Sequence, residues 1–410
     1  MIAAPHDPDA DVCIAGAGPV GSFLACLLGA AGVRTRVAER RTAPPARSMA
    51  IGIMPPTLRR FAALGLASPL VAAGCGVERA VVHDGRRALG DLGFASLPPP
   101  YPFVLALPQG ELVRTLWARM DAVATFAPGT AVEGFAADAD GVEVRLRSAR
   151  EPAGRALRCR FLVLCDGVHG RLSAELGLDT PPRPYRPTFV MGDAKDGTGW
   201  GAEAHLFFTP EGSIESFPLP DGLRRWVALT RSGDPADTAE ALCARVSRLA
   251  GVPLRTEDLV DASRFTPAYR LARSFAAGRV ALCGDAAHTM SPIGGQGMNT
   301  GLMDAWHLAG TLVRLVRTGD DPAGPLRRYG QVRRRAFRRA ARRAAIGMWV
   351  GTRTGTAVSA VRARVVRGLL QRRAMQPRLA RFFSMTSIPA GRDAALDEMA
   401  RLNPTRSAAP

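Results

Sequence analysis

The sequence predicts an α/β protein that has a first domain built on a β-α-β unit, an inserted, mostly antiparallel β-sheet and a helical C-terminal tail. Residues 11–40 show the order strand, helix, strand, with a glycine-rich turn after the first strand. Residues 186–231 are rich in β-branched and aromatic residues and contain the turn sequences "PEGS" and "PDG". From Gly301 onward the pattern is helical, with interruptions near 319–325 and 351–356.

The elements of the first domain follow in order. The apolar run "DVCIAGAG", which ends at Gly18, predicts a buried strand, and the helical pattern over 19–32 ends at Gly32 as its C-cap. The run "RTRVAER" over 34–40 predicts the next strand. The remaining expected elements are a helix over 55–66 with Pro in its first turn, a helix over 109–120, a hairpin over 130–148 turning at Asp140 and Gly141, and buried strands over 158–167 and 279–285.

The chain of 410 residues is long enough for two or three domains and a large core. The first, discontinuous domain is predicted to comprise 1–75, 105–180 and 270–345. The inserted sheet is predicted to comprise 76–104 and 181–269, and the C-terminal helices 346–410.

Composition argues against several classes of protein. Apolar residues make up 47% of the chain, which is typical of a globular protein. The N-terminus lacks the basic region of a signal peptide, and no apolar run approaches the roughly 20 residues of a membrane span. Seven scattered cysteines without a CxxC pair indicate reduced thiols in the cytoplasm and no metal site.

The net charge of +18 is concentrated near the C-terminus. The segment 322–391 contains 17 arginines and no Asp or Glu. A concentrated positive charge can steer an anionic partner without being specific. We expect a mainly structural tail in which Ile346, Trp349 and Val350 form a buried apolar face, with a weak anionic partner as a lesser role.

A glycine motif after the first strand predicts dinucleotide binding. Gly16, Gly18 and Gly21 fit the pattern GxGxxG between a strand and a helix. The first glycine forms the turn, the second lets a pyrophosphate approach the backbone, and the third lets the helix pack on the strand. Glu39 ends the second strand, where a carboxylate accepts hydrogen bonds from an adenosine ribose, and the adjacent Arg40 is a further predicted contact. A glycine-rich turn with a surface Glu is the alternative.

A second glycine-rich segment, "ALCGDAAHTMSPIGGQGMNTG" over 281–301, identifies the dinucleotide. It resembles the second FAD motif of the single-component flavoprotein monooxygenases, the family of p-hydroxybenzoate hydroxylase. The resemblance implies a Rossmann-like FAD-binding domain in which Asp285 binds the ribityl chain and the following loop wraps the edge of the isoalloxazine ring. It implies that 292–299 is the reaction face, with Pro292 and Gly295 as the catalytic positions. The implied FAD contacts on this loop are Gly295, Gly297, Met298 and Asn299.

A third segment, "CDGVHGRLSAELG", resembles the family's DGxxSxxR motif, which is associated with FAD and NAD(P)H contacts. Asp166 and Gly167 match and are implied FAD contacts. Gly170 replaces the usual Ser and Ser173 the usual Arg, so the role of that arginine is not carried over unless Arg171 substitutes for it.

Two further positions, Arg47 and Gln109, resemble FAD contacts of the family, with a solvated residue as the alternative at each. His288, next to the flavin motif, is expected to be a packed supporting group rather than a base. His205 is expected to be a structural histidine, with a substrate contact as the alternative. No metal ligand set is predicted.

The resemblance implies an NAD(P)H-dependent monooxygenase with non-covalently bound FAD. Its flavin C4a-hydroperoxide, formed with O₂, would hydroxylate an aromatic or polyketide-like small molecule. The sequence contains no second GxGxxG, so NAD(P)H is expected to bind at the flavin domain. The oligomeric state is left open.

Two alternatives remain at this point. One is an FAD-dependent reductase or dehydrogenase of a polyprenyl or lipid-like substrate, which would share the same FAD motifs. The other is a binding protein that uses its tail on nucleic acid or an anionic membrane, since the segment "RRRAFRRAARRA" over 333–344 is strongly basic. Helical spacing spreads these arginines around the helix and aromatic residues are few, so no specific nucleic-acid partner is expected.

Overall fold

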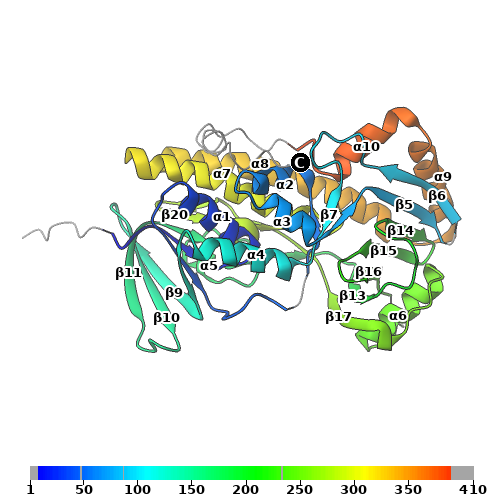
Figure 1. Ribbon diagram of the computed structural model, residues 1–410, viewed down its shortest axis with the longest axis horizontal. Helices are drawn as coiled ribbons and strands as arrows, with labels where there is room; N and C mark the ends of the chain where they lie inside the picture. The colour runs from blue at the N-terminus through cyan, green and yellow to red at the C-terminus, as the bar shows by residue number, and fades with distance from the viewer. Residues whose placement is uncertain (1–7, 47–48, 86, 232–233, 389–410) are drawn as a thin grey trace, which may run out of the picture.

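The computed structural model describes residues 8–46, 49–85, 87–231 and 234–388. Two sheets organise these residues, and they lie side by side along the long axis of the molecule (Figure 1). The α/β fold class, the inserted sheet and the helical C-terminal region predicted from the sequence are all present.

The first sheet has eight strands, and its central path runs in the order β19-β20-β11-β1-β2-β8. Strands β20, β11, β1, β2 and β8 are parallel, and β9 and β10 extend the sheet as an antiparallel hairpin. The strands are β1 Ala10–Ala15, β2 Thr35–Glu39, β8 Thr125–Pro128, β9 Thr130–Ala137, β10 Val142–Ser148, β11 Arg155–Leu164, β19 Ala276–Ala277 and β20 Val280–Leu282. Every residue of β1 is buried, as expected for a central strand covered on both faces.

Helices α1 (Pro19–Ala30), α4 (Gln109–Asp121) and α7 (Gln296–Thr318) form one packed layer on this sheet, with α1 in contact with both α4 and α7. Their apolar faces form one core with the strands, which includes Phe23, Leu116 and Leu308. The predicted helix is present but shorter than 19–32: it ends at Ala30, its C-cap is Ala31 rather than Gly32, and Gly32 follows with φ +75°.

The second sheet has seven strands in the order β17-β13-β16-β15-β14-β5-β6. Neighbouring strands are antiparallel except β14 and β5. The strands are β5 Arg79–Asp84, β6 Arg87–Gly93, β13 Phe189–Lys195, β14 Ala204–Thr209, β15 Gly212–Pro218, β16 Leu223–Leu229 and β17 Leu259–Phe265. Helix α6 (Thr238–Leu249) covers one face, whereas α8 (Ala323–Thr352) and α9 (Thr356–Leu370) lie on the other side of the sheet (Figure 1).

Shorter elements connect the two parts. Two small sheets have the orders β3-β7-β4 and β12-β18-β21. Their strands are β3 Gly52–Ile53, β4 Cys75–Val77, β7 Val104–Ala106, β12 Arg183–Pro184, β18 Ala268–Leu271 and β21 His288–Thr289. The short helices are α2 Pro55–Ala62, α3 Ala67–Ala72, α5 Leu172–Glu175 and the 3-10 turns Thr256–Asp258, Gly284–Ala286 and Arg373–Met375.

The C-terminal region consists of α8 (Ala323–Thr352), α9 (Thr356–Leu370) and α10 (Gln376–Phe383). The breaks before α8 and before α9 fall where the sequence predicts them, whereas the break between α9 and α10 was not predicted. The expected boundary at 345/346 falls inside α8, and the domain limits remain a prediction. No helix of the described residues is long and apolar enough to cross a membrane.

The predicted buried face of this region is wrong. Ile346 and Trp349 are 57% and 59% exposed, and Val350 is only half-buried. The buried face instead contains Ala340, Ala344 and Met348 at intervals of four residues. Small residues on this face let α8 lie close to its neighbours, which turns the larger apolar side chains outward.

Candidate functional site

The first glycine motif has the geometry that its three roles require. Gly16 has φ +103°, and a Cβ there would lie 2.5 Å from the carbonyl oxygen of Cys165. A Cβ on Gly21 would lie 2.0 Å from the carbonyl oxygen of Gly16, so α1 packs on the turn only with glycine at this position. A Cβ on Gly18 would meet no atom within 4 Å. The second glycine therefore faces open space at the N-terminus of α1, which has no side-chain cap.

Glu39 holds this turn in place. Its Oε2 accepts a hydrogen bond from the backbone N–H of Ala17 at 2.7 Å, and Oε1 accepts from the backbone N–H and Nε of Arg41 at 3.0 Å. Glu39 is 4% exposed. Arg40 is exposed and lines an open pocket of about 360 Å³ together with Gly129. Contacts of Glu39 and Arg40 with a cofactor remain predictions.

The two glycine motifs, far apart in sequence, lie against each other. A Cβ on Gly301 would lie 2.8 Å from Val20 Cγ2 and 3.1 Å from the Cα of Gly284. A Cβ on Gly284, which has φ +65°, would lie 3.0 Å from the same Val20 methyl group. These close approaches bring the N-terminal turns of α1 and α7 together. Two helix N-termini side by side favour negatively charged ligand groups.

The segment 290–296, which leads into α7 and which we call the flavin loop, has a backbone that is open to contact with a ligand. Gly294 and Gly295 have φ +80° and +62°, and the N–H of Gly295 donates to the carbonyl of Pro292 at 2.9 Å. Pro292 and Gly295 are exposed. Helix α7 has no side-chain cap, so the first-turn backbone N–H groups have no acceptor within the helix. These groups belong to Gln296, Gly297 and Met298.

Gln296 carries an unsatisfied polar atom in this loop. Its side chain is 2% exposed, and its Oε1 has no hydrogen-bond partner among the described residues. A buried polar atom of this kind is costly unless a bound group satisfies it.

Asn299 is a structural clamp. Its Oδ1 accepts from the backbone N–H of Met54 at 2.9 Å and from the Thr57 hydroxyl at 2.8 Å. Its Nδ2 donates to the carbonyls of Gly52 and Gly295, both at 2.8 Å. The side-chain amide is therefore fully used within the protein, and direct contact with a cofactor remains a prediction.

Asp285 lies at the end of β20 and faces open space. It is exposed although its neighbours Gly284 and Ala286 are buried. The surrounding protein removes part of the hydration of this carboxyl and raises its pKa, an effect that His288 and Arg270 oppose. An accessible carboxyl set among buried residues is suited to accept hydrogen bonds from a bound polyol chain.

Arg270 is a residue of this site that the sequence did not indicate. It is 7% exposed, its Nη2 donates to the carbonyl of Asp285 at 2.5 Å, and its Nη1 lies 3.6 Å from Asp179. It also partly opposes the rise in the pKa of Asp166 that burial causes. An isolated arginine on a short strand carries no sequence signal in a chain this rich in arginine.

Asp166 follows β11 and points into the same region. Burial raises its pKa, and its Oδ1 has no hydrogen-bond partner among the described residues. Gly167 has φ +79°. A Cβ on Gly170 would lie 2.1 Å from the Asp166 carboxyl carbon, so glycine at 170 makes room for this carboxyl. Arg171 is exposed, and Ser173 is buried with its hydroxyl bound to Asp179 at 2.8 Å.

The two remaining predicted contacts lie near the loop before β3. Arg47 falls outside the described residues. Gln109 exchanges hydrogen bonds with Ala50: the N–H of Ala50 donates to Gln109 Oε1 at 3.3 Å, and the N–H of Gln109 donates to the Ala50 carbonyl at 3.1 Å. Gln109 thus braces the segment that follows Arg47, and its role toward a cofactor remains a prediction.

His288 is packed, as expected. Its Nε2 lies 2.5 Å from Asp304 Oδ2, and Asp304 Oδ1 accepts from Arg333 Nε at 2.6 Å. All three side chains are at most 2% exposed. Burial acts to raise the pKa of Asp304, but Arg333 and His288 outweigh it and hold this pKa below its ordinary value. The network joins α7 to α8 behind the flavin loop.

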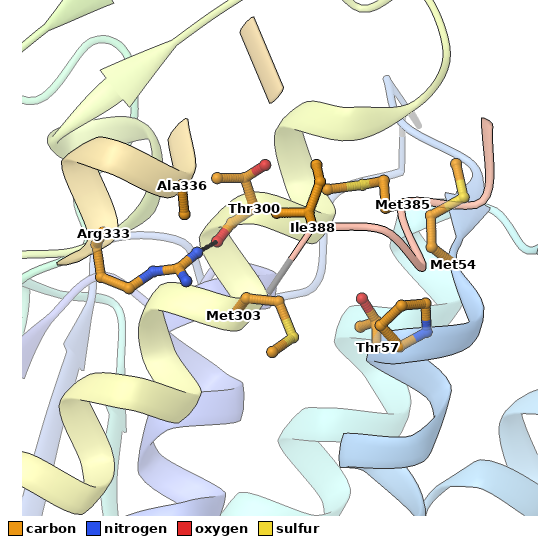
Figure 2. Close-up of a pocket in the computed structure, with 9 residues that line it drawn as sticks. Met54, Thr57, Thr300, Met303, Arg333, Ala336, Met385 and Ile388 are labelled. Atoms are coloured by element: carbon orange, nitrogen blue, oxygen red, sulfur yellow. Dashed lines mark hydrogen bonds between the residues drawn. The ribbon is translucent and has the colours of Figure 1, made fainter. Parts of the chain in front are cut away.

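A small cavity adjoins this network (Figure 2). It has a volume of about 20 Å³, which is room for one water molecule and too little for a substrate. Side chains from α2, α7 and α8 line it, and the C-terminal segment closes it with Met385 and Ile388.

His205 is packed in a ring cluster, and its purely structural role remains a prediction. It is 4% exposed, stacks on Trp200 with ring centroids 3.8 Å apart, and has its Nδ1 2.9 Å from His83 Nε2. Burial is the largest cause that lowers its pKa to about 4. Its ring cluster includes Phe207, which belongs to the α6 side of the sheet, away from the flavin loop.

The opposite face of the second sheet lies against the flavin loop. We call it the covered sheet face, because apolar side chains from the sheet, the loop and α8 meet there in one cluster: Phe189, Val227, Leu229, Ile293 and Met348. A substrate held between the sheet and the flavin loop would meet this apolar surface.

The residues present fit FAD. Gly18 leaves space for a pyrophosphate, the first-turn amides of α7 face a ligand, and Asp285 and Asp166 supply accessible or unsatisfied carboxyl oxygens. Among the described residues, no cluster of His, Cys, Asp and Glu could hold a metal ion.

Comparisons with known proteins agree with this geometry. The family profile described as "FAD binding domain" matches residues 9–344. The chain is 33% identical over 322 residues to 6-methylpretetramide 4-monooxygenase of Streptomyces rimosus, covering 76% of this chain and 57% of that protein. It is 31% identical over 337 residues to rifampicin monooxygenase of Streptomyces venezuelae, covering 78% of this chain and 67% of that protein.

Solved structures show the same fold. The anhydrotetracycline hydroxylase OxyS of Streptomyces rimosus superposes with a TM-score of 0.75 at 28% identity, covering 92% of this chain and 76% of that one. The p-nitrophenol 4-monooxygenase of Pseudomonas putida superposes with a TM-score of 0.84 at 22% identity, covering 92% and 98% of the two chains. The chain spans only 57% and 63% of the lengths of two relatives from Streptomyces rimosus, 6-methylpretetramide 4-monooxygenase and 12-dehydrotetracycline 5-monooxygenase/anhydrotetracycline 6-monooxygenase. The profile match over most of the chain, together with these relatives, shows that the protein belongs to the FAD-binding family of aromatic hydroxylases that includes p-hydroxybenzoate hydroxylase.

Proposed function

We propose that the protein is an FAD- and NAD(P)H-dependent monooxygenase that hydroxylates an aromatic or polyketide-like small molecule. The observation that carries this proposal is the position of the flavin loop: Ile293 packs on the covered sheet face, the exposed Pro292 and Gly295 lie on either side of Ile293 in the chain, and the uncapped N-terminus of α7 follows. The monooxygenases of tetracycline and rifampicin among its relatives support an aromatic polyketide as substrate and a role in secondary metabolism.

Each part of the site has a task in binding the cofactor. The open backbone at Gly18 would hold the pyrophosphate, Glu39 the adenosine ribose, and Asp285 the ribityl chain. The free amides of α7 would stabilise negative charge on the flavin ring. Bound FAD supplies the redox chemistry, since it accepts electrons from NAD(P)H and activates O₂.

The protein itself must position the substrate and exclude water. The segment 290–296 contains no charged residue, and Ile293 packs against the apolar cluster of the covered sheet face. An apolar surface on one side and a flat loop on the other favour a planar aromatic ring. Excluding water from this space would protect the activated oxygen from side reactions.

We also propose a cytoplasmic location and NAD(P)H binding at the flavin domain without a domain of its own. All seven cysteines are described and none forms a disulfide, which is typical of a reducing compartment. The basic C-terminal region is proposed to be mainly structural, with at most a weak anionic partner and no specific nucleic acid, because α9 and α10 contribute Leu370 and Ala380 to a buried cluster.

A substrate panel tests the function. The FAD-loaded protein is given NAD(P)H, O₂ and, in turn, hydroxylated anthraquinones, simple phenols and a prenylated quinone. We expect a hydroxylated aromatic to stimulate NAD(P)H oxidation and to gain one oxygen atom, shown by mass after reaction under ¹⁸O₂. Quinone reduction without incorporation of oxygen would instead support the reductase alternative.

A further inference from the structure

One acidic residue on the covered sheet face has no task in the site described so far. Glu215 lies in the middle of β15, directly opposite Leu206 of β14 and Val227 of β16. Its neighbour Ile214 packs in the α6 cluster on the other face. Because side chains alternate along a strand, the Glu215 side chain lies on the covered sheet face. This is the face on which Val227 packs with Ile293 of the flavin loop.

The flavin loop and α8 come close to the second sheet near Ser213, which lies on β15 like Glu215. A Cβ on Gly351 would lie 3.6 Å from both Ser213 Oγ and Phe208 Cε1, and 3.8 Å from Ile293 Cδ1. Ser213 is two residues before Glu215 and therefore on the same face, about 7 Å away. Glu215 thus stands beside the point where the loop, α8 and the sheet converge.

The Glu215 carboxyl is partnerless. The side chain is half-buried, and among the described residues no hydrogen bond or ion pair engages it. Its cross-strand neighbours are apolar. A carboxyl kept on an apolar face without a partner is destabilising, unless a ligand uses it. Burial alone raises its pKa to about 7. A general base is most effective when its pKa lies near the operating pH, as it would here at neutral pH.

Several charged side chains on the elements around Glu215 are engaged with other groups. Arg225 and Asp193, on β16 and β13, form an ion pair with N–O distances of 2.6 and 2.8 Å. Arg362 of α9 donates to the carbonyl of Thr209 at 2.8 Å. Asp84, at the end of β5, accepts from the Ser359 hydroxyl at 3.4 Å.

The parts of the flavin loop and of α8 that lie beside Glu215 contain no charged residue. The segments 290–296 and 344–352 contain no Asp, Glu, Lys or Arg. Tyr185 is a titratable residue that packs against the same apolar cluster, and it forms a hydrogen bond with the backbone of Ser291. The histidines His83 and His205 belong to the α6 side.

We propose that Glu215 is the general base that takes the proton of a phenolic substrate, an assignment that rests on the proposed hydroxylase function. The substrate O–H bond breaks, the proton goes to the Glu215 carboxylate, and the electron pair stays on the phenolic oxygen. That oxygen then makes the ring carbons ortho and para to it electron-rich toward an electrophilic oxygen. After product release the carboxyl returns the proton to solvent.

The test uses the FAD-loaded full-length protein, with Glu215→Gln as the isosteric variant without a base. Glu143→Gln is the matched control, since Glu143 is an exposed carboxylate on β10. Two measurements are made: turnover of the phenol panel against pH, and the visible absorbance of bound 4-nitrophenol, which reports its ionised fraction. Bound FAD and the unfolding temperature are measured for each variant to confirm folding.

We expect wild-type turnover to rise with pH through about 7, as Glu215 ionises. Glu215→Gln should lose this rise, fall on the order of 10²-fold in turnover and bind 4-nitrophenol in its neutral form. Glu143→Gln should behave as wild type. An unchanged pH profile and an unchanged ionised fraction in Glu215→Gln would overturn the role of Glu215 but leave the proposed function standing.

Two further outcomes complete the test. If Glu215→Gln does not fold, the assignment is tested with Glu215→Asp. Its shorter carboxylate should keep the pH dependence of turnover while the turnover rate falls. A turnover rate equal to that of wild type in Glu215→Asp would overturn the assignment. If no phenol of the panel binds to or is turned over by the wild-type protein, both the assignment and the proposed function are overturned.

Discussion

The side-chain oxygen of Asn299 accepts a hydrogen bond from the backbone N–H of Met54 at 2.9 Å, between positions 245 apart in the sequence. The bond ties the first turn of α7 to the start of α2, so the flavin loop and the segment after β3 form one rigid unit. Asn299 is 1% exposed and its side-chain amide makes four hydrogen bonds within the protein. Both N–H donors and both acceptor positions of the amide oxygen are therefore used.

Replacing this clamp should weaken both the fold and the site. Asn299→Ala would leave the N–H of Met54 and the carbonyl of Gly52 buried without partners. We expect the free energy of unfolding to fall by about 2–4 kcal/mol and FAD affinity to fall with it. Urea denaturation and a fluorescence titration with FAD measure the two effects. Asn299→Asp keeps the acceptor and should lose less; equal stability of all three proteins would contradict the clamp.

Two variants of the first glycine motif should affect FAD binding and protein stability separately. Gly21→Ala should destabilise the protein, because its Cβ would lie 2.0 Å from the carbonyl oxygen of Gly16. Gly18→Ala should leave the apoprotein as stable as wild type, because Gly18 has φ −67° and open space beside it, but it should weaken FAD binding. Thermal unfolding of the apoproteins and FAD titration distinguish the two variants. Equal FAD affinity in Gly18→Ala and wild type would count against a pyrophosphate at this position.

Asp285 provides a direct test of cofactor binding. Asp285→Ala should weaken FAD binding by roughly 1.5–3 kcal/mol, the range for hydrogen bonds to a charged group. The fold should survive, because the lost partner is the cofactor. Asp285→Asn keeps one carbonyl acceptor and should lose less affinity. If a fluorescence titration showed wild-type affinity in the alanine variant, the ribityl assignment would be wrong.

The buried network of Asp304 predicts an acid-sensitive fold. The pKa of Asp304 is lowered in the folded protein, so the stability it contributes is present above its unfolded pKa and is lost as pH falls through the folded value. Arg333→Met should cost about 3–5 kcal/mol, since it removes one of the two partners of the buried Asp304 charge and leaves only His288. It should also shift the loss of stability toward higher pH. Thermal unfolding from pH 7 downward measures both; identical pH profiles would exclude the pair as a source of acid sensitivity.

Deletion of 353–410 tests whether the C-terminal helices are mainly structural. Leu370 and Ala380 pack with Leu92 and Phe94 of the second sheet, so the deletion would expose this cluster. We expect a lower unfolding temperature or aggregation. A truncated protein that stays folded and yellow, while losing a partner whose binding is weakened by salt, would instead show that the region is a binding arm.

The elements of the FAD domain could be predicted from the sequence because their signals are local. A strand, a glycine turn and a helix within about thirty residues define the first motif, and the structure places Gly16, Gly18 and Gly21 in the three environments expected. The loop at Gly294 and Gly295 is equally local, since its left-handed backbone requires glycine.

The orientation of α8 was predicted incorrectly for a physical reason. Its sequence offers two faces that are both partly apolar, one with Ile346 and Trp349 and one with Ala344 and Met348. Hydrophobicity favours the first, but close packing beside Ile293 requires small residues, as Gly347 and Gly351 show. Only the neighbouring surface decides between the two faces.

The sequence by itself therefore determined the fold class, the two FAD motifs and the family resemblance, because each rests on residues close together in the chain. The tertiary structure alone decided what Arg270 and Glu215 contribute. Arg270 approaches Asp285 through the pairing of two short strands, and Glu215 faces the flavin loop through strand register and the position of α8. Such contacts depend on which distant surfaces meet, and that is set by packing of the whole chain rather than by any local pattern.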